Sequence, residues 1–542
     1  MALALSKFEI PSLLIDRRKS NYSEPRAHAL NPRTLEIFSS LGMDVDDFKA
    51  VATPTEESCW VRWLDTLDGG EYGKLPYERM HAKDDLPTPW PLLNVAQPAT
   101  EIVMQNYVER ESSIQSLRPW QWKSCESMDG GIESLVIDDQ GQERRIFSRY
   151  LIGADGAGSP VRESQNIKMN GMGIIHDFMM IHFKADLTEV VKNKPAILYW
   201  VMKQDCSGTF IAYDMRGNWV FMHGYDDADT DISRFTEDYC ETLLKKAIGR
   251  SDIDIEIISR GNWGLGSQVS ESYRKGNIFL IGDAAHRYPP SGGLGLNTGV
   301  GDAHNLAWKI AGVLQDWAWP NLLESYHSER EHVAQINAAF STENAGKLFS
   351  IMLATRSLMP NGHQPSFETL KSDPEIWAEI EAAIREQRDH FDGLAIQIGQ
   401  HYGRKNAPDL RADDFQFNDV GARFPHTWLT IAGKRASSLV LLSAKQFTVI
   451  ARSDAQIPKI KTSIPFQVKI ENTDFAADKA NLKTIGLDDV AAIIVRPDGH
   501  IAARLIGPKI SQSEVDGAFS RAVAKFTGLR SSDPVSAIEG RS

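Results

Sequence analysis

The chain has 542 residues, of which 42% are hydrophobic and 24% are charged, so it can bury several cores and is predicted to form two to four domains. Its formal net charge of -13 disfavours a nucleic-acid partner, because proteins that bind a phosphate backbone present basic stripes. No uncharged apolar run reaches the roughly 18 residues of a membrane span. Four widely spaced cysteines and the lack of a signal peptide indicate a cytoplasmic protein with reduced thiols and no metal site.

The start of the chain predicts a short helix over Ala2–Phe8 and then a strand over Ser12–Ile15, which ends at Asp16. Two interpretations fit this segment. It is either an ordinary N-terminal helix and strand, or the second half of a βαβ unit whose first strand lies upstream, because parallel strands are joined by a crossover helix. A further helix is predicted over Thr34–Leu41.

The middle of the chain predicts a mixture of strands and helices. A strand is expected over residues 144–152, and the aromatic and β-branched segments Phe178–Phe183 and Gly217–His223 predict an antiparallel sheet. A buried strand follows at Ile278–Ile281, and a long helix is expected to begin near Asp302. More helix extends to about residue 400, and its charged stretch over residues 375–388 is interpreted as a solvated face.

Beyond a polar linker over residues 404–422, the pattern changes to strands. They are predicted at Ser438–Leu442, Phe447–Ile450, Phe466–Ile470 and Ala491–Val495. The turn Arg496-Pro497-Asp498-Gly499 then predicts a hairpin, because proline, aspartate and glycine favour tight turns. These residues therefore predict a separate C-terminal α/β domain.

The most specific stretch covers residues 281–297, Ile-Gly-Asp-Ala-Ala-His-Arg-Tyr-Pro-Pro-Ser-Gly-Gly-Leu-Gly-Leu-Asn. A buried strand here delivers an acid, Asp283, at its carboxyl end. Prolines stiffen the following turn, and glycines let backbone amides approach a ligand at the start of a helix. This arrangement suits a ligand with a polyol and an electron-rich ring. A purely structural turn has little use for three glycines among residues 292–295.

This stretch resembles the second FAD-binding motif of the single-component flavoprotein aromatic hydroxylases, the family of para-hydroxybenzoate hydroxylase, phenol hydroxylase and dichlorophenol hydroxylase. The resemblance implies that Asp283 binds the ribityl hydroxyls, and that backbone amides over Gly293–Asn297 face the flavin pyrimidine edge, near the positive end of a helix. The cofactor-binding residues implied in this stretch are Gly282, Asp283, Pro290, Gly293, Leu294, Gly295, Leu296 and Asn297.

Two further segments match the family. Residues 150–162 resemble its Asp-Gly motif, which lies near FAD and the nicotinamide cofactor, although Asp-Gly after a strand can also be a plain turn. Residues 25–36 resemble a segment whose arginine binds the FAD phosphates, a role suited to a bidentate guanidinium. In the family, an acidic residue at the end of a strand accepts hydrogen bonds from the adenosine ribose, and Asp16 is at the end of its predicted strand. The resemblance thus adds Asp16, Arg17, Arg26, Gln97, Asp155 and Gly156 as cofactor-binding residues.

Three residues are candidates for catalysis. In phenol hydroxylase the position matching His28 is a carboxylate that helps to deprotonate the phenol. An imidazole titrates near neutrality and can serve as that base, although a histidine bonded to a loop carbonyl is the alternative. Tyr213 is expected on the substrate sheet and Tyr288 near the flavin. Each either bonds a phenolic oxygen or packs as a buried aromatic ring.

One expected motif does not occur, since the sequence contains no Gly-x-Gly-x-x-Gly. A dinucleotide fingerprint opens about 20 residues before its ribose acid, whereas fifteen residues precede Asp16. We therefore expect the chain to begin inside the crossover helix, without the first strand and the glycine loop. A shortened gene product of this kind is expected to bind FAD poorly.

The predicted fold is α/β: a truncated Rossmann-like FAD-binding domain with an inserted antiparallel substrate sheet, plus a C-terminal thioredoxin-like α/β domain. Dithiol chemistry is excluded in that last domain, because it contains no cysteine. The expected divisions are FAD binding over 1–165, with part of the substrate sheet at about 56–95, then the substrate sheet over 166–275, FAD binding with a helical segment over 276–405, and the thioredoxin-like domain over 420–542.

The resemblance implies an FAD-dependent monooxygenase. It would hydroxylate a phenolic or other activated aromatic compound with NADPH or NADH and O2, through a flavin C4a-hydroperoxide. One alternative is an oxygenase of the same fold that acts on a polyketide-like compound. Another is a truncated, inactive form that serves as an interaction module. A homodimer is a further expectation.

Overall fold

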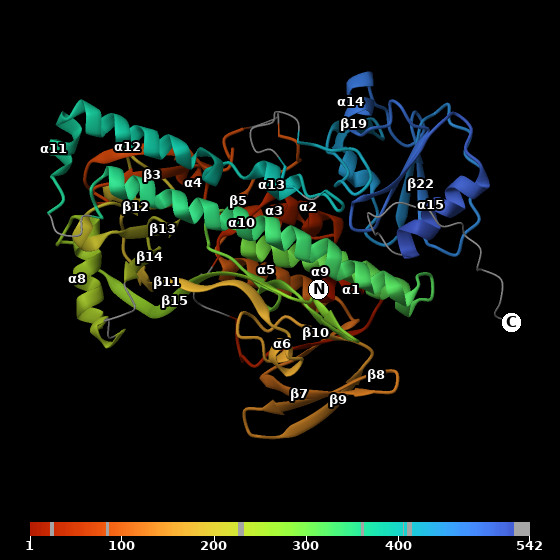
Figure 1. Ribbon diagram of the computed structural model, residues 1–542, viewed down its shortest axis with the longest axis horizontal. Helices are drawn as coiled ribbons and strands as arrows, with labels where there is room; N and C mark the ends of the chain where they lie inside the picture. The colour runs from red at the N-terminus through yellow and green to blue at the C-terminus, as the bar shows by residue number, and fades with distance from the viewer. Residues whose placement is uncertain are drawn as a thin grey trace.

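The computed structural model describes residues 1–21, 27–82, 86–225, 232–358, 363–404, 406–408 and 415–524. Figure 1 shows a central helical layer, a large sheet at one end of the molecule and the C-terminal domain at the other. A three-stranded meander, β7 (Trp120–Met128), β8 (Gly131–Asp138) and β9 (Glu143–Ser148), projects from the centre.

Two small sheets contain the parallel strands near the centre. Helix α1 (Ala2–Ser6) leads into β1 (Ser12–Ile15), which pairs in parallel with β6 (Ile114–Leu117). In the other sheet, β10 (Leu151–Gly153) pairs in parallel with β17 (Ile278–Leu280), and β16 (Arg274–Lys275) lies at its edge. The single strand predicted over 144–152 is wrong, because β9 ends in the meander and β10 begins a different sheet.

The large sheet has eight strands in the order β18-β15-β11-β14-β13-β12-β3-β4. Every neighbouring pair is antiparallel except the parallel pair β12 and β3. The strands are β3 (Trp60–Leu64), β4 (Glu71–Pro76), β11 (Met169–Lys184), β12 (Leu198–Val201), β13 (Gly208–Asp214), β14 (Asn218–Tyr225), β15 (Glu256–Ser270) and β18 (His286–Arg287). The antiparallel sheet predicted for the middle of the chain is confirmed.

The two faces of this sheet carry different side chains, because successive residues of a strand point to opposite sides. On one face, Phe210 and Phe221 pack in a core with α8 (Glu237–Ile248). On the other face, Ile211, Tyr213 and Val220 form a smaller cluster with partly buried methionine and leucine side chains. We call the second face the Tyr213 face of the sheet.

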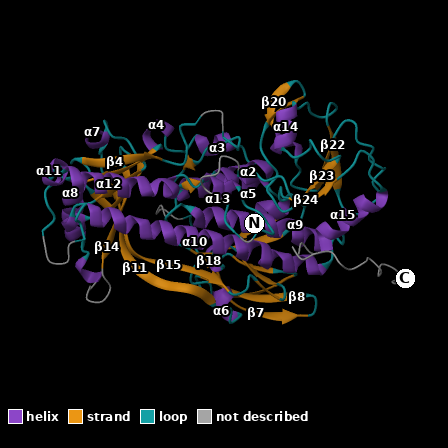
Figure 2. Ribbon diagram, turned by 45° about the horizontal axis from the view of Figure 1, so that its top comes forward, coloured by secondary structure: helices purple, strands orange, loops and turns teal. Residues whose placement is uncertain are grey.

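The central helices are α9 (Leu294–Leu314) and α10 (Glu324–Ala354). Figures 1 and 2 show α10 running from the large sheet toward the C-terminal domain. The sequence predicted that this helix begins near Asp302, but α9 begins earlier, at Leu294. Two glycines of low helix propensity lie in this earlier part of the helix, and both are closely packed. A Cβ on Gly299 would lie 3.0 Å from Cα of Gly282, and one on Gly301 would lie 2.7 Å from Nη2 of Arg330. Close packing here outweighs the low helix propensity of glycine.

The C-terminal domain contains a four-stranded sheet in the order β22-β21-β23-β24, formed by β21 (Phe447–Ala451), β22 (Phe466–Ile470), β23 (Ala492–Val495) and β24 (Ile501–Leu505). β21 and β22 are parallel, β23 is antiparallel to β21, and α15 (Gln512–Ala524) follows β24. This is the expected thioredoxin-like topology. The strand predicted at Ser438–Leu442 is wrong, because Ser437 accepts a hydrogen bond from the Leu439 amide and starts the 3-10 helix Ser438–Leu441.

Shorter elements connect these parts. The helices are α2 (Pro32–Ser40), α3 (Val45–Lys49), α4 (Thr55–Ser58), α5 (Gln97–Arg110), α6 (Pro160–Ser164), α7 (Thr188–Val191), α11 (Phe367–Ser372), α12 (Pro374–Glu386), α13 (Leu394–Ile398) and α14 (Lys479–Thr484). The strands are β2 (Ala29–Leu30), β5 (Leu93–Asn94), β19 (Trp428–Ile431) and β20 (Lys434–Ser437). The 3-10 helices are Gln204–Cys206, Ile232–Arg234, Gly282–Ala284, Pro320–Leu323 and Gln387–Phe391.

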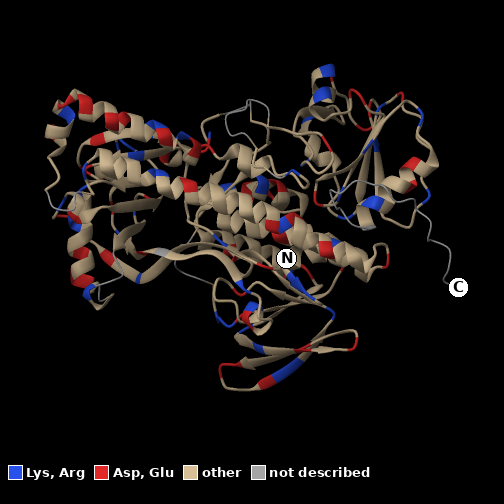
Figure 3. Ribbon diagram, viewed as in Figure 1, with Lys and Arg blue, Asp and Glu red and all other residues tan. Residues whose placement is uncertain are grey.

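Charged residues of both signs are interspersed along the elements, as Figure 3 shows for α12 and α10. Within the described part of the chain, no helix combines the length and the apolar character that crossing a membrane requires.

Candidate active site

The glycine-rich stretch forms a loop between β17 and α9, and a buried carboxylate holds it in place. Oδ2 of Asp302 accepts hydrogen bonds from the Gly282 amide at 3.1 Å and pairs with Nε2 of His286 at 2.8 Å. Oδ1 accepts from Nε of Arg330 at 2.8 Å. Burial would raise the pKa of Asp302, but Arg330 and His286 outweigh this effect and hold it below its usual value. Asp302 thus fixes the backbone next to the exposed Asp283.

The N-terminus of α9 is open to a ligand. Gly293 is its N-cap residue, with φ of 62°, and no side chain caps the helix. A Cβ on Gly295 would have no heavy atom within 4 Å, so space lies over the first turn. Uncapped amides at the positive end of a helix favour an electron-rich group. The resemblance assigns these residues to the pyrimidine edge of a flavin, and that assignment stays a prediction.

Asn297 joins this helix to the segment that carries His28. Its Nδ2 donates to the carbonyl oxygens of Ala29 at 2.9 Å and Gly293 at 2.6 Å. Its Oδ1 accepts from the Asn31 amide at 3.0 Å and from Thr34 Oγ1 at 2.7 Å. The side chain of Asn297 is therefore fully used in holding the two segments together.

His28 lies beside Asn94, with 2.9 Å between its Nδ1 and Oδ1 of the amide. The pairing of β2 with β5 sets this contact, since Ala29 is directly opposite Asn94. The Val95 amide also donates to the His28 carbonyl at 2.7 Å. Burial lowers the pKa of His28, and its hydrogen bond to Asn94 opposes the change. The ring is neutral at neutral pH, as a proton acceptor must be.

Two tyrosines approach the His28 ring. The Tyr213 ring, on β13, meets it edge-on with the centroids 5.9 Å apart, and the Tyr77 ring lies at 6.5 Å. Both tyrosines are buried, and burial raises the pKa of each phenol well above its usual value. His28 therefore lies between the Tyr213 face of the sheet and the loop after β4.

The structure separates the two tyrosines proposed from the sequence. Tyr288 packs in the central core, where its ring stacks on His286 at 5.0 Å with an interplanar angle of 3°. The ring contact with His28 is made by Tyr213, whereas the ring contact of Tyr288 is with His286.

The other predicted cofactor residues surround the small parallel sheets. Both carboxylate oxygens of Asp16 accept hydrogen bonds from Arg18, Oδ1 from Nε at 3.2 Å and Oδ2 from Nη2 at 3.1 Å. Oδ2 also pairs with Nη2 of Arg118 at 3.1 Å. The neighbouring Arg17 is exposed. Asp155 accepts from Ser159 Oγ and from the Val161 amide at 2.9 Å, at the start of α6.

Gly156 has φ of 86°, in the left-handed region. Gln97 is the first residue of α5, and its side-chain Nε2 donates to Glu101 Oε1 at 2.8 Å. Its backbone amide donates to the Ala27 carbonyl oxygen at 2.9 Å. Pro290 is exposed, Leu294 is buried and Leu296 is partly buried, all near the start of α9. Arg26 lies outside the described residues. The expectation that a strand and glycine loop precede this chain stays a prediction.

A buried ionic cluster connects this region to the C-terminal domain. In the hairpin between β23 and β24, Arg496 donates to Glu329 of α10 at 2.8 and 2.9 Å. Lys309 of α9 donates to the same carboxylate at 2.8 Å, and Trp308 Nε1 donates to Asp498 at 3.1 Å. Each of these side chains is almost fully excluded from solvent. The hairpin predicted from Pro-Asp-Gly is confirmed, and its turn contacts both central helices.

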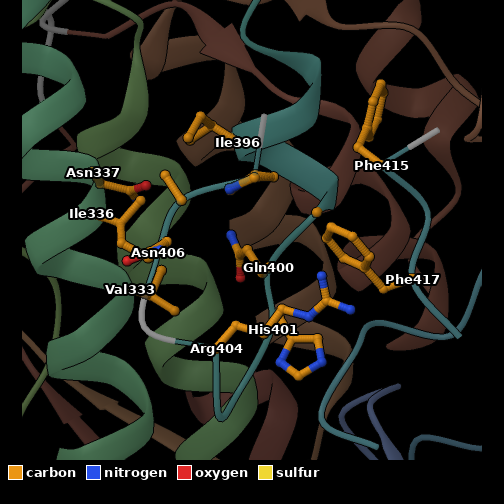
Figure 4. A pocket seen from close by; sticks show the side chains of 13 residues that line it. Val333, Ile336, Asn337, Ile396, Gln400, His401, Arg404, Asn406, Phe415 and Phe417 are labelled. Atoms are coloured by element: carbon orange, nitrogen blue, oxygen red, sulfur yellow. The ribbon is translucent and has the colours of Figure 1, made fainter. Parts of the chain in front are cut away.

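A cavity of about 450 Å³ lies between α10 and the segment that follows α13 (Figure 4). Figure 4 shows Asn337 and Gln400 on its walls, with Arg404 beside Phe417. The Arg404 guanidinium lies 3.7 Å from the centre of the Phe417 ring. None of the residues predicted as functional lines this cavity.

Sequence reasoning missed Asn94, Tyr77 and Arg330. Asn94 and Tyr77 contact His28, and Arg330 contacts Asp302. These partners are distant in the chain, so no local sequence pattern indicates the contacts. The pairing of β2 with β5 is the signal that connects Asn94 to His28, and it spans only two residues on each strand.

Known proteins share this architecture over nearly its full length. Residues 1–341 match the family described as FAD binding domain, and residues 418–525 match the family described as aromatic-ring hydroxylase, C-terminal. The chain is 28% identical to 2,4-dichlorophenol 6-monooxygenase of Delftia acidovorans, over 93% of this chain and 92% of that protein. It is 27% identical to tetracenomycin A2 monooxygenase-dioxygenase of Streptomyces glaucescens, over 97% and 95%.

Among solved structures, the flavin-dependent monooxygenase PieE in complex with FAD and substrate superposes with a TM-score of 0.83. It is 26% identical and covers 96% of both chains. The chain therefore belongs to the family of FAD-dependent aromatic-ring hydroxylases and is an FAD-dependent monooxygenase.

Proposed function

We propose that this protein hydroxylates a phenolic ring, with NADPH or NADH and O2 as co-substrates. The observation that carries the proposal is the position of His28. Its ring is neutral, contacts Tyr213 on the large sheet, and is adjacent to Ala29, which packs against Gly293 at the start of α9. In this proposal His28 is the base, the Tyr213 face is the apolar wall, and the start of α9 faces the cofactor.

The residues have separate tasks in this proposal. When bound, FAD would supply the activation of dioxygen, and dioxygen itself would supply the oxygen atom that is transferred to the ring. His28 accepts the phenolic proton, which makes the ring more electron-rich and more reactive toward an electrophilic oxygen. The Tyr213 face holds the ring and excludes water. Amides at the start of α9 stabilise negative charge at the pyrimidine edge.

A wider aromatic substrate is the second candidate. The partly buried apolar residues of the Tyr213 face extend over several strands, and they are Met180, Leu198 and Met222. A face of this width suits a polycyclic ring system, and one of the relatives above is named for tetracenomycin A2 and not for a simple phenol.

The test combines cofactor binding with coupled turnover. The full chain is titrated with FAD by fluorescence, and then NADPH or NADH oxidation is followed with a panel of simple phenols and a panel of polycyclic phenols under ¹⁸O2. Incorporation of ¹⁸O into a simple phenol supports the first proposal, and incorporation only into polycyclic compounds supports the second. Oxidation of the nicotinamide by the FAD-bound chain, with hydrogen peroxide as the sole product throughout, contradicts both.

The oligomeric state is a separate proposal. We propose a homodimer, and light scattering of the purified chain tests it. A molar mass equal to that of the 60.4 kDa chain would contradict it.

A further inference from the structure

We infer that Asn94 is a positioning residue that holds His28 with its proton on Nδ1, so that Nε2 is the nitrogen that accepts the substrate proton. The inference deepens the proposed function, on which the role of Nε2 rests. The tautomer itself is a property of the protein alone and can be measured without cofactor or substrate.

The backbone leaves little freedom in the contact between these two side chains. β2 and β5 pair with Ala29 opposite Asn94. The strand ends are extended by two hydrogen bonds, from the Val95 amide to the His28 carbonyl at 2.7 Å and from the Gln97 amide to the Ala27 carbonyl at 2.9 Å. Nδ1 and Oδ1 therefore meet at 2.9 Å across a paired ladder and not through a flexible loop.

The orientation of the Asn94 amide follows from its other neighbours. Nδ2 lies 3.3 Å from Sδ of Met80 and 3.5 Å from the Ser58 carbonyl oxygen, and both atoms can only accept hydrogen bonds. A reversed amide would place Oδ1 against two acceptors. Asn94 is 1% exposed, so water cannot compensate for the loss. Oδ1 must face His28, and an oxygen acceptor requires a proton on Nδ1.

Among the described residues, the side chains in ring contact with His28 carry no charge at neutral pH. The titratable side chains in ring contact with His28 are Tyr77, from the loop after β4, and Tyr213 of β13. Both phenols are neutral at neutral pH, because burial raises the pKa of each. A neutral amide partner keeps His28 available as a base. A carboxylate in its place would stabilise the imidazolium and raise the pKa of the ring.

The proton transfer then balances simply. The phenolic O–H bond breaks, its electron pair stays on the oxygen as phenolate, and the proton forms an N–H bond at Nε2. The Nδ1 proton remains bonded to Asn94, and that bond strengthens because its donor has become cationic. Asn94 itself does not touch the substrate.

The experiment is a long-range ¹H–¹⁵N correlation spectrum of the full chain labelled with ¹⁵N-histidine, recorded above pH 8 without flavin or substrate. The His28 signals are assigned by their loss in His28→Gln. His223 is the internal standard, because its Nδ1 lies 2.7 Å from the Ser207 carbonyl oxygen and must carry the proton. We expect His28 to show the same pattern as His223, with a protonated Nδ1 and an unprotonated Nε2.

Two variants separate positioning from general support of the fold. In Asn94→Leu, which has similar size and no acceptor, we expect the Nε2–H tautomer to appear. In Asn94→Asp, we expect Nδ1–H to persist and the pKa of His28 to rise by about one unit or more. Unchanged His223 signals show that each variant is folded.

The inference is overturned if wild-type His28 is protonated on Nε2, or if folded Asn94→Leu keeps the wild-type tautomer. Should Asn94→Leu not fold, the wild-type spectrum and Asn94→Asp still decide. Where hydroxylation is detected, the acidic limb of the pH profile of kcat/KM is expected to move upward in Asn94→Asp with the pKa of His28. A protein that does not hydroxylate but shows the expected tautomer contradicts the proposed function and leaves the role of Asn94 intact.

Discussion

Arg496 and Glu329 meet across the boundary between the C-terminal domain and the central helices, with two nitrogen-to-oxygen distances of 2.8 and 2.9 Å. Burial would lower the pKa of Arg496, but Asp498 and Glu329 hold it above its usual value. Burial would raise the pKa of Glu329, but Arg496 and Lys309 bring it down to about 2. Both side chains are charged throughout the physiological range. The boundary is therefore held by an ion pair that solvent cannot replace.

Glu329→Gln is expected to destabilise the protein by about 3 kcal/mol or more, because it leaves Arg496 and Lys309 buried with too little negative charge. Urea unfolding at neutral pH measures this loss. The control is Glu381→Gln on α12, whose carboxylate is half exposed and pairs with Arg385 at 3.5 Å. Exposed pairs contribute little, so no measurable change is expected there. Equal effects of the two substitutions would contradict the role of the buried cluster.

Gly295→Ala is expected to weaken FAD binding without destabilising the protein. The added Cβ meets no atom of the chain, and alanine is favoured over glycine in a helix by up to about 1 kcal/mol. The same Cβ enters the space over the first turn of α9, where the flavin edge is proposed to lie. FAD titration and thermal unfolding of the apoprotein separate the two effects.

Gly346→Ala is the matched control for this substitution. Gly346 lies within α10, and a Cβ there also meets nothing within 4 Å. Its stability is expected to change as in Gly295→Ala, with FAD affinity unaltered. Normal FAD affinity in Gly295→Ala would place the flavin elsewhere.

Asp302→Asn is expected to loosen the loop that carries Asp283. An amide cannot neutralise Arg330, which is 0% exposed, so a buried guanidinium is left without its closest anion. The expected cost is about 3 kcal/mol or more. A drop in melting temperature together with a higher dissociation constant for FAD is the predicted result. Asp316→Asn, just beyond the end of α9, serves as the comparison and should change neither quantity.

The stability of Glu78→Gln relative to wild type is expected to depend on pH. Burial, with a smaller contribution from Asp392, raises the pKa of Glu78 to about 8, and its Oε2 accepts from the Gly393 amide at 3.1 Å and from Gln397 at 2.9 Å. A glutamine oxygen can accept the same two bonds.

Between pH 4.5 and about 8 the folded wild type retains a proton that the unfolded chain has lost, so its stability falls as pH rises through this window. Glutamine does not titrate. Glu78→Gln should therefore gain on the order of 3–5 kcal/mol over wild type between pH 5 and pH 9, measured by urea unfolding. A constant difference between the two proteins would show that Glu78 is ionised in the fold at neutral pH.

The elements with strong local signals could be predicted from the sequence. The strand at Ile278–Leu280, its glycine loop and the hairpin turn at Arg496–Gly499 follow from apolar runs and turn residues that determine local backbone shape. The start of α9 could not be located, because tertiary packing of Gly299 and Gly301 outweighs their propensity. The apolar run at Ser438–Leu442 fits a strand and a short helix equally well by periodicity.

The candidate site could be predicted only in part for a similar reason. His28 and Tyr213 were identified as candidates from the sequence, and the structure brings their rings together. Asn94 and Tyr77 depend on pairings between distant segments, which a single sequence does not display. The buried charges Glu329 and Arg496 look like surface residues until their partners are known.

Glu329 and Arg330 are neighbours on α10, but their side chains have partners in different parts of the molecule. Glu329 accepts hydrogen bonds from Arg496 in the C-terminal hairpin, and Arg330 donates to Asp302, the residue that holds the glycine-rich loop. This arrangement constrains how the protein can be recombined with its relatives. A chimera that takes its C-terminal domain from one parent and α10 from another must keep the acid at 329 and the arginine at 496 together. Crossover points within residues 331–495 divide that pair between parents, so libraries built there should retain function only where both parents carry the same two charges.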